Sequence, residues 1–376
     1  MSASPKRIIL MYISEVSGHH SATIAIERAI RILEPQTEIL NINAFNYTNP
    51  VTEKIINKIY MGVIKHTPKI WDYLYDNPNV ARRLERIKKA VHKFNFPKLQ
   101  NLLDDFRPDV VACSQAFPCG MVADYKLNCN VFIPLVAVLT DFVPHSYWIY
   151  DKVDYYVTPS EDVSMRLEHK GVSSDKIKSL GIPFDPKFNE LQDRQKLSQK
   201  LKLDPDAPTV LIMGGGQGLG PIHGIIDSLD SLQRKVQMIV VTGTNMKLYL
   251  SLKRKIEKCL SRIVLYGYAS NVHELMSVSD IIITKPGGIT TSEVLAKSLP
   301  MIIANPLPGQ EAKNTAYLTE KGAAVKIDDA REIGTVVDDL FTHPDKLSRL
   351  RESAAVISKP HSSADIARLL LSLPHG

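Results

Sequence analysis

Each half of the chain opens with a short apolar segment that runs into a glycine-containing turn, and this repeated start constrains the fold most. Arg7–Ile13 lead towards Gly18, and Thr209–Met213 lead into the glycine-rich run Gly214–Gly220. After each start, short β-branched segments alternate with helical stretches, as in a parallel sheet with helices on both faces. The pattern predicts an α/β protein with two tandem, Rossmann-like, doubly wound parallel-sheet domains, and 376 residues are enough for two cores.

Breaks in this pattern place the domain boundaries. We expect an N-terminal domain over residues 1–184, a charged, proline-flanked linker over 185–208, a C-terminal domain over 209–358 and a return helix within 359–376. The strands expected in the first domain are Arg7–Ile13, Thr37–Ile42, Val110–Cys113, Phe132–Leu139 and Tyr155–Thr158, and the helices are Ser21–Leu33, Thr52–Lys65, Asn79–Phe94 and Ser160–His169. The second domain is expected to contain the strands Thr209–Met213, Gln237–Thr242, Ile263–Gly267 and Asp280–Thr284, and the helices Met246–Cys259 and Val272–Val278.

Composition and cysteine spacing indicate a cytosolic protein without a membrane-spanning helix. Hydrophobic residues make up 44% of the chain and charged residues 23%, which is ordinary for a globular protein. No apolar window is long enough to cross a bilayer. The first apolar run, of about seven residues, leads into a glycine turn rather than a cleavage site, which favours a strand over a signal peptide. The four cysteines lack the spacing of a zinc site and are expected to be reduced.

One segment, residues 51–100, accounts for the whole net charge of +6. It contains eleven Lys or Arg against four Asp or Glu, interleaved with isoleucines and aromatic residues. Such a mixture occurs on surfaces that bind nucleic acid or an anionic membrane, and also on an ordinary solvated helical face. These three interpretations stay open from composition alone.

The segment Thr284–Asn314 carries the clearest functional pattern. A buried-type strand ends at a Pro286-Gly287-Gly288 turn, which lets the backbone approach a ligand and exposes the N-terminus of the next helix. Glu293 lies in the first turns of that helix, where a carboxylate can accept hydrogen bonds from vicinal hydroxyls such as those of a ribose. A later loop adds Gln310, Glu311 and Asn314. A helix N-terminus for a diphosphate and carboxylates for sugars together favour a nucleotide-sugar ligand.

These motifs resemble the donor-binding signature of inverting glycosyltransferases of the GT-B type, with an inter-domain cleft between the two domains. The resemblance is to the family of the processive diacylglycerol glucosyltransferases and monogalactosyldiacylglycerol synthases, related to the lipid II glucosaminyltransferase. It implies UDP-glucose or UDP-galactose as donor, diacylglycerol as acceptor and no cofactor or metal. The donor-binding residues that it implies are Gly18, Gly216, Gln217, Gly218, Ala269, Pro286, Gly287, Gly288, Thr290, Ser292, Glu293, Gln310, Glu311 and Asn314.

The first domain contributes two candidates for the base that activates the acceptor hydroxyl, His19 and Asp141. Gly18-His19 follows the first strand, where ligands of a doubly wound sheet bind. Here Val16 and Ser17 replace two glycines of the family's turn. Asp141 belongs to a Thr-Asp-x-x-x-His-x-x-Trp pattern that the family shares. A histidine near its ordinary pKa, or a carboxylate in a dry cleft, can each serve as a base at neutral pH.

The resemblance also favours the membrane interpretation of the basic segment, with docking on the cytosolic face of an anionic membrane and no nucleic acid as partner. The residues expected to contact the acceptor or the membrane are Trp71, Arg82, Arg83, Lys88, Lys89, His145 and Trp148. Two other classes of function compete with a lipid glycosyltransferase. One is a UDP-N-acetylglucosamine 2-epimerase on the same fold, and the other is a non-catalytic protein that binds a nucleotide or a membrane surface.

Overall fold

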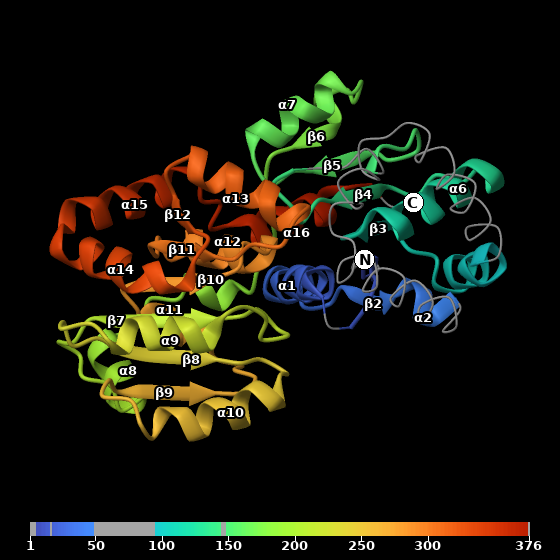
Figure 1. Ribbon diagram of the computed structural model, residues 1–376. Helices are drawn as coiled ribbons and strands as arrows, with labels where there is room; N and C mark the ends of the chain where they lie inside the picture. The colour runs from blue at the N-terminus through green and yellow to red at the C-terminus, as the bar shows by residue number, and fades with distance from the viewer. Residues whose placement is uncertain (1–4, 16, 49–94, 144–147, 375–376) are drawn as a thin grey trace. The chain divides into compact units, whose positions relative to one another are not determined.

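The computed structural model describes residues 5–15, 17–48, 95–143 and 148–374. The chain divides into two compact units (Figure 1). Unit 1 comprises Met1–Pro186, Pro308–Gln310 and His361–Gly376, and unit 2 comprises Lys187–Leu307 and Glu311–Pro360. The expected helices Thr52–Lys65 and Asn79–Phe94 lie outside the described residues.

Unit 1 is built on a parallel sheet with the strand order β2-β1-β3-β4-β5-β6. The strands are β1 (Arg7–Tyr12), β2 (Glu38–Asn43), β3 (Val110–Cys113), β4 (Leu135–Val138), β5 (Tyr155–Val157) and β6 (Ile177–Lys178). The helices are α1 (Gly18–Leu33), α2 (Ala44–Thr48), α6 (Ala116–Cys129), α7 (Glu161–His169), α16 (Ser362–Ser372) and the short η2 (Ser174–Lys176), and residues 95–106 are also helical.

Alternate residues of the unit 1 strands belong to two separate hydrophobic cores, because successive side chains of a strand point to opposite faces of the sheet. Ile9 and Met11 join one core with α6 and residues 95–106, whereas Ile8 and Leu10 join the other with α1 and α16. Helix α16 comes from the end of the chain and is fixed to unit 1 by Ser362, whose hydroxyl donates to the Ile182 carbonyl at 2.9 Å.

Unit 2 repeats the architecture with a parallel sheet in the order β12-β11-β10-β7-β8-β9. Its strands are β7 (Thr209–Met213), β8 (Gln237–Val241), β9 (Ile263–Tyr266), β10 (Ile281–Thr284), β11 (Met301–Ala304) and β12 (Ala324–Ile327). The helices are α8 (Arg194–Lys200), α9 (Ile222–Asp230), α10 (Met246–Ile256), α11 (Val272–Ser277), α12 (Gly288–Ala296), α13 (Gln310–Glu320), α14 (Ile333–Thr342) and α15 (Pro344–Ile357), with the short η3 (Pro186–Asn189) and η4 (Ala330–Glu332).

The charged segment after Asp185 is tied to unit 2 rather than running free. Arg194 donates two hydrogen bonds to the Asp280 carboxylate, at 2.8 and 2.9 Å, in the bidentate geometry that guanidinium groups favour. Lys200 pairs with Glu274 at 2.7 Å. The residues expected to form a linker therefore belong to unit 2 from Lys187 onward.

The predicted fold class of two doubly wound parallel sheets is confirmed. The strand expected over Phe132–Leu139 covers only Leu135–Val138 in the structure. Phe132, before this strand, is 63% exposed. Several elements were not expected from the sequence: β6, β12, α2, α6, α14 and α15. Gln310, Glu311 and Asn314, which were expected in a loop, lie in helix α13 instead.

Candidate active site

His19 lies where the sheet of unit 1 changes direction. The chain runs from β1 to β2 on one side and reaches β3 on the other side of β1, so the carboxyl ends of β1 and β3 flank a topological switch point. His19 is the second residue of α1, the helix that follows β1. The Ser17 hydroxyl caps this helix by accepting from the His20 N–H at 3.3 Å.

Two neighbouring loops fix the orientation of the His19 ring. Its Nδ1 lies 2.8 Å from the Ser114 carbonyl oxygen and 3.1 Å from the Thr140 hydroxyl. The Ser114 hydroxyl in turn donates to the His19 carbonyl at 2.9 Å. A carbonyl can only accept, so Nδ1 carries the proton and Nε2 carries the lone pair.

The surroundings of His19 also favour its neutral form. Burial lowers the pKa of the imidazole, and the hydrogen bond to the Ser114 carbonyl opposes this effect only in part. A neutral ring whose proton is fixed on Nδ1 presents Nε2 as a base. Sequence reasoning found His19 but missed Ser114, which follows β3. Thr140, which follows β4, belongs to the Thr-Asp motif but was not expected to contact His19.

Asp141, the other candidate base, directly follows Thr140 and is half-buried. The structure therefore brings the loop of Asp141 to His19 through the hydroxyl of Thr140.

Trp148 differs from the expectation, because it is 4% exposed and belongs to the core of unit 1. A side chain packed in this core does not face a membrane. The other residues expected to contact acceptor or membrane, Trp71, Arg82, Arg83, Lys88, Lys89 and His145, lie outside the described residues.

In unit 2 the glycine-rich loop after β7 has one packed side and one open side. Gly218 is buried, with a φ of +58°, and a Cβ added there would lie 2.1 Å from the Thr242 carbonyl oxygen. Gly216 is exposed, and an added Cβ would meet nothing within 4 Å. Gln217 between them is exposed. Gly218 is therefore required for packing against the β8 loop, whereas Gly216 and Gln217 are accessible to a ligand.

The second turn, between β10 and α12, has an equally open start. Gly287 is the N-cap of α12, is exposed, and has nothing within 4 Å of an added Cβ. The flanking Pro286 and Gly288 are buried. The expected ligand residues of α12 follow within two turns: Thr290 and Glu293 are half-buried, and Ser292 is 8% exposed.

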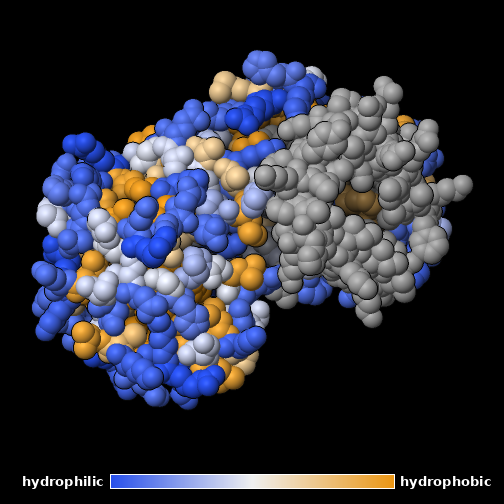
Figure 2. Space-filling model, viewed as in Figure 1, coloured by the Kyte–Doolittle hydropathy of each residue, from blue (hydrophilic) through white to orange (hydrophobic). Residues whose placement is uncertain are grey.

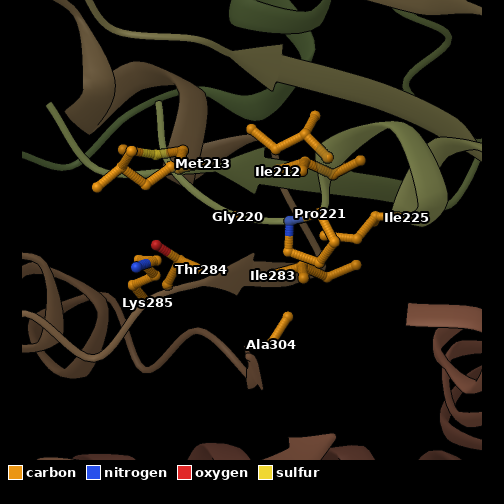
Figure 3. A pocket seen from close by; sticks show the side chains of 11 residues that line it. Ile212, Met213, Gly220, Pro221, Ile225, Ile283, Thr284, Lys285 and Ala304 are labelled. Carbon is orange, nitrogen blue, oxygen red and sulfur yellow. The ribbon is translucent and has the colours of Figure 1, made fainter. Parts of the chain in front are cut away.

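A pocket lies at the switch point of this second sheet, between β7 and β10 (Figure 3). Its apolar part includes Ile212, Ile225, Ile283 and Ala304. Thr284 and Lys285 add polar groups at the end of β10, and the Thr284 hydroxyl has no hydrogen-bond partner among the described residues. Both turns therefore border the same switch point, where doubly wound sheets bind their ligands.

Lys285 was not expected from the sequence, yet it organises the loop before α13. It is 9% exposed, and its Nζ lies 3.4 Å from Glu311 Oε2. The same Glu311 oxygen accepts the Leu307 N–H at 2.7 Å. Glu311 thus holds the loop that leads to Gln310, the half-buried first residue of α13.

Asn314 has a similar supporting contact. It is 1% exposed, and its side-chain amide donates to the Pro286 carbonyl at 2.9 Å. This bond ties α13 to the turn before α12, so Asn314 positions the turn from within the protein. Ala269, expected near the base of the nucleotide, is half-buried in the loop after β9.

Acidic residues that could hold a metal do not gather at this site. The sequence contains one Asp-x-Asp, Asp204-Pro205-Asp206, a pattern able to bind a divalent cation. It precedes β7 and therefore lies at the opposite edge of the sheet from the glycine-rich loop. Within the described part of the chain, no group of three His, Cys, Asp or Glu is arranged to hold a metal ion. Nor does any described helix have the length and apolarity needed to cross a membrane.

Family comparisons match both units. A model of the monogalactosyldiacylglycerol (MGDG) synthase family matches residues 19–184, and a model of the glycosyltransferase family 28 C-terminal domain matches residues 209–369. The chain is 27% identical over 372 residues to the processive diacylglycerol beta-glucosyltransferase of Bacillus subtilis strain 168, covering 97% of this chain and 95% of that protein.

Solved structures share the fold at lower identity. MurG of Acinetobacter baumannii superposes with a TM-score of 0.65 at 13% identity, covering 98% of this chain and 99% of that one. The UDP-GlcNAc 2-epimerase of Neisseria meningitidis bound to UDP-GlcNAc gives a TM-score of 0.64 at 14% identity, covering 97% of this chain and 99% of that one. These likenesses confirm the GT-B fold, with two Rossmann-like domains.

Proposed function

Because the chain belongs to the glycosyltransferase family that joins an MGDG synthase domain to a family 28 C-terminal domain, we propose that it transfers glucose or galactose from a UDP-sugar to diacylglycerol. The reaction inverts the configuration at the anomeric carbon and yields a glycolipid. The observation that carries the catalytic part of this proposal is the orientation of His19, whose Nδ1 proton is fixed on the Ser114 carbonyl.

In the proposed reaction, Nε2 of His19 removes the proton of the acceptor hydroxyl as its oxygen attacks the anomeric carbon. The bond from that carbon to the β-phosphate oxygen breaks, and UDP leaves with the electron pair. Asp141 lies next in sequence to Thr140, the ring's second neighbour, and is the alternative base.

The leaving UDP is assigned to unit 2. The N-terminus of α12 and the exposed backbone of Gly216 and Gly287 face the diphosphate, because free N–H groups at such turns favour anions. Glu293 accepts from the ribose hydroxyls, and Gln310 contacts the hexose. We propose that no metal ion is needed, since these dipoles already stabilise the leaving charge.

The acceptor side of the proposal concerns a membrane. Diacylglycerol remains in the bilayer, so the enzyme is proposed to attach peripherally to the cytosolic face. The basic segment with Trp71, Arg82, Arg83, Lys88 and Lys89 is the proposed contact, through attraction to anionic lipid.

The comparisons support a transferase over an epimerase. The relatives at 27 to 29% identity are named glucosyltransferases, whereas the epimerases among the solved structures share the fold at 14% identity or less. A fold alone does not determine function.

The proposal is tested by incubating the purified chain with vesicles containing diacylglycerol and either UDP-glucose or UDP-galactose, followed by mass spectrometry of the lipids. A hexose added to diacylglycerol from one donor is expected, and its identity decides between the two sugars. Conversion of UDP-N-acetylglucosamine to UDP-N-acetylmannosamine, without lipid products, would instead establish the epimerase. Binding of UDP without turnover on any of the three donors would establish a non-catalytic protein.

A further inference from the structure

Helix α10 of unit 2 has an outward face that mixes apolar and basic side chains. Its inner side packs on the sheet through Leu252, which is fully buried, and through the partly buried Leu248. On the outside, Met246 is 62% exposed and Leu250 is 51% exposed. These two residues are four apart and therefore adjacent on one helical face.

Just beyond the helix, Leu260 is 94% exposed, which extends the apolar surface past the end of α10. Figure 2 shows hydrophobic atoms among hydrophilic ones on the part of unit 2 where α10 lies. Single exposed apolar residues are common on protein surfaces, so these three residues alone do not indicate a binding surface. The charges around them must also be considered.

The surrounding charge is strongly positive. Residues 246–262 contain six Lys or Arg against Glu257 alone. Lys255 pairs with Asp227, but the exposed Lys247, Lys253, Arg254, Lys258 and Arg262 form no ion pair with another described residue. Unpaired cations beside exposed methionine and leucine distinguish this face from α15, whose Arg349 and Lys346 are paired with Asp345 and Asp339.

The helix also begins at the ligand-binding edge of the sheet. Thr244 donates from its N–H to the Gly216 carbonyl at 2.9 Å, and the Asn245 side chain donates to the Gly218 carbonyl at 3.3 Å. Asn245 is the N-cap of α10 and accepts from the Leu248 N–H at 3.0 Å. Whatever binds the outward face of α10 therefore lies close to the glycine-rich loop, to which the UDP is assigned.

We propose that the outward face of α10, formed by Met246, Lys247, Leu250, Lys253, Arg254, Lys258 and Leu260, docks unit 2 on an anionic lipid bilayer. Cations attract the lipid phosphates, and the apolar side chains enter the headgroup region, as in other basic amphipathic helices at interfaces. A nucleic acid would use the same cations but would leave Met246, Leu250 and Leu260 in water. The inference rests on the proposed function in taking a membrane lipid as the acceptor, and it adds a second contact outside residues 51–100.

The test is co-sedimentation of the full chain with vesicles of phosphatidylcholine alone or mixed with phosphatidylglycerol. One variant replaces the cations (Lys247→Gln, Lys253→Gln, Arg254→Gln, Lys258→Gln), and a second replaces the apolar pair (Met246→Ser, Leu250→Ser). A matched control removes four cations that are ion-paired elsewhere on unit 2 (Lys326→Gln, Arg331→Gln, Lys346→Gln, Arg349→Gln).

Each cation near an anionic surface contributes about fivefold to partitioning, so the α10 cation variant is expected to lose at least about 100-fold on the phosphatidylglycerol vesicles. The apolar variant is expected to lose about tenfold, and the control to stay within about threefold. Equal losses in the control and the cation variant would show a general effect of net charge and overturn the proposal. An unchanged apolar variant, or tighter binding to single-stranded RNA than to the mixed vesicles, would also overturn it.

Failure of this inference is separable from failure of the proposed function. Transfer to diacylglycerol dispersed in neutral detergent micelles does not require an anionic bilayer, so the α10 variants are expected to keep the parent rate there. A parent chain without transfer in micelles and vesicles would refute the proposed function, whereas loss of vesicle binding by the variants is measured without any turnover.

Discussion

The pair of Lys285 and Glu311 offers the sharpest test of how unit 2 holds its candidate site. Their side chains are only 10% and 23% exposed, and the charged atoms lie 3.4 Å apart. At an effective dielectric constant of about 20, charges at this distance attract by about 5 kcal/mol, and the cost of removing both from water offsets much of that gain. We expect a net coupling of about 1–3 kcal/mol, larger than for an exposed pair.

The perturbation is a double-mutant cycle with Lys285→Met and Glu311→Gln. The glutamine keeps an oxygen that can accept the Leu307 N–H, so it removes the charge and preserves the loop's hydrogen bond. Each single variant leaves one partly buried charge without its partner and should lower the free energy of unfolding by about 2 kcal/mol. The double variant should lose less than the sum of the two.

The assay is urea unfolding followed by circular dichroism and by tryptophan fluorescence. Neither of the two tryptophans, Trp71 and Trp148, belongs to the sequence of unit 2, so a transition seen only by circular dichroism reports on unit 2. A matched control is the exposed pair Lys326 and Asp328, at 2.9 Å and 43% and 77% exposed, for which the coupling should be at most about 0.5 kcal/mol. Additive effects in the Lys285–Glu311 cycle would refute the role assigned to the pair.

Three further predictions address the residues that contact substrate or shape the loops. His19→Ala should lower kcat by about 10²–10⁴-fold with little change in UDP affinity, and the acid limb of kcat/KM for the parent should lie below pH 6.5 because burial lowers the pKa of His19. As the pH drops, the imidazole of His19 takes up a proton at a higher pH in the unfolded chain than in the folded one, so the free energy of unfolding should fall below about pH 6.5. This part of the fall should be absent in His19→Ala. An unchanged kcat in His19→Ala would leave Asp141 as the base. Glu293→Ala should weaken UDP binding by about 1.5–3 kcal/mol in calorimetry, and equal affinity in a folded variant would remove the ribose assignment. Gly218→Ala should destabilise unit 2 by at least about 2 kcal/mol, because its Cβ would meet the Thr242 carbonyl oxygen, whereas Gly216→Ala should be nearly neutral in denaturation and weaken only UDP binding.

The tandem α/β pattern was predictable because buried parallel strands are short, apolar and β-branched in both halves. Helix α6 was not, since residues on all sides of it are buried and it therefore lacks a polar stripe. Its Pro118 and Gly120 are also residue types of low helix propensity, which predict an interruption of a helix. Strand β12 has two accessible residues between two buried ones, and its four positions are too few to establish a period.

The candidate site was predictable only where a motif carried its own chemistry. The glycine turns follow strands, and His19 and Glu293 lie in the first two turns of the helices that come next, so their place at the ligand edge was predictable. Ser114 and Thr140 reach His19 from 95 and 121 residues away, through the pairing of β1, β3 and β4. Although Thr140 belongs to the Thr-Asp motif, no local pattern reveals that either residue contacts His19, because the sheet topology alone brings them together.

For Lys285 and Trp148, the residue type misleads about burial. A lysine at the end of a strand usually extends into water, yet Lys285 is buried beside Glu311. The family resemblance implied that Trp148 contacts the acceptor or the membrane, yet Trp148 fills the core of unit 1. Residue type alone did not distinguish these roles, because burial depends on the neighbours that tertiary packing supplies.

The central claim is that His19 of unit 1 and the turns of unit 2 transfer a hexose to diacylglycerol with inversion. The most direct measurement is the anomeric configuration of the lipid product by proton NMR, after incubation of the full chain with diacylglycerol vesicles and UDP-glucose or UDP-galactose in its α form. A β-linked glycolipid that the parent makes, and that His19→Ala makes far more slowly, is the predicted result. An α-linked product, or no lipid-bound hexose from either donor, would contradict the account.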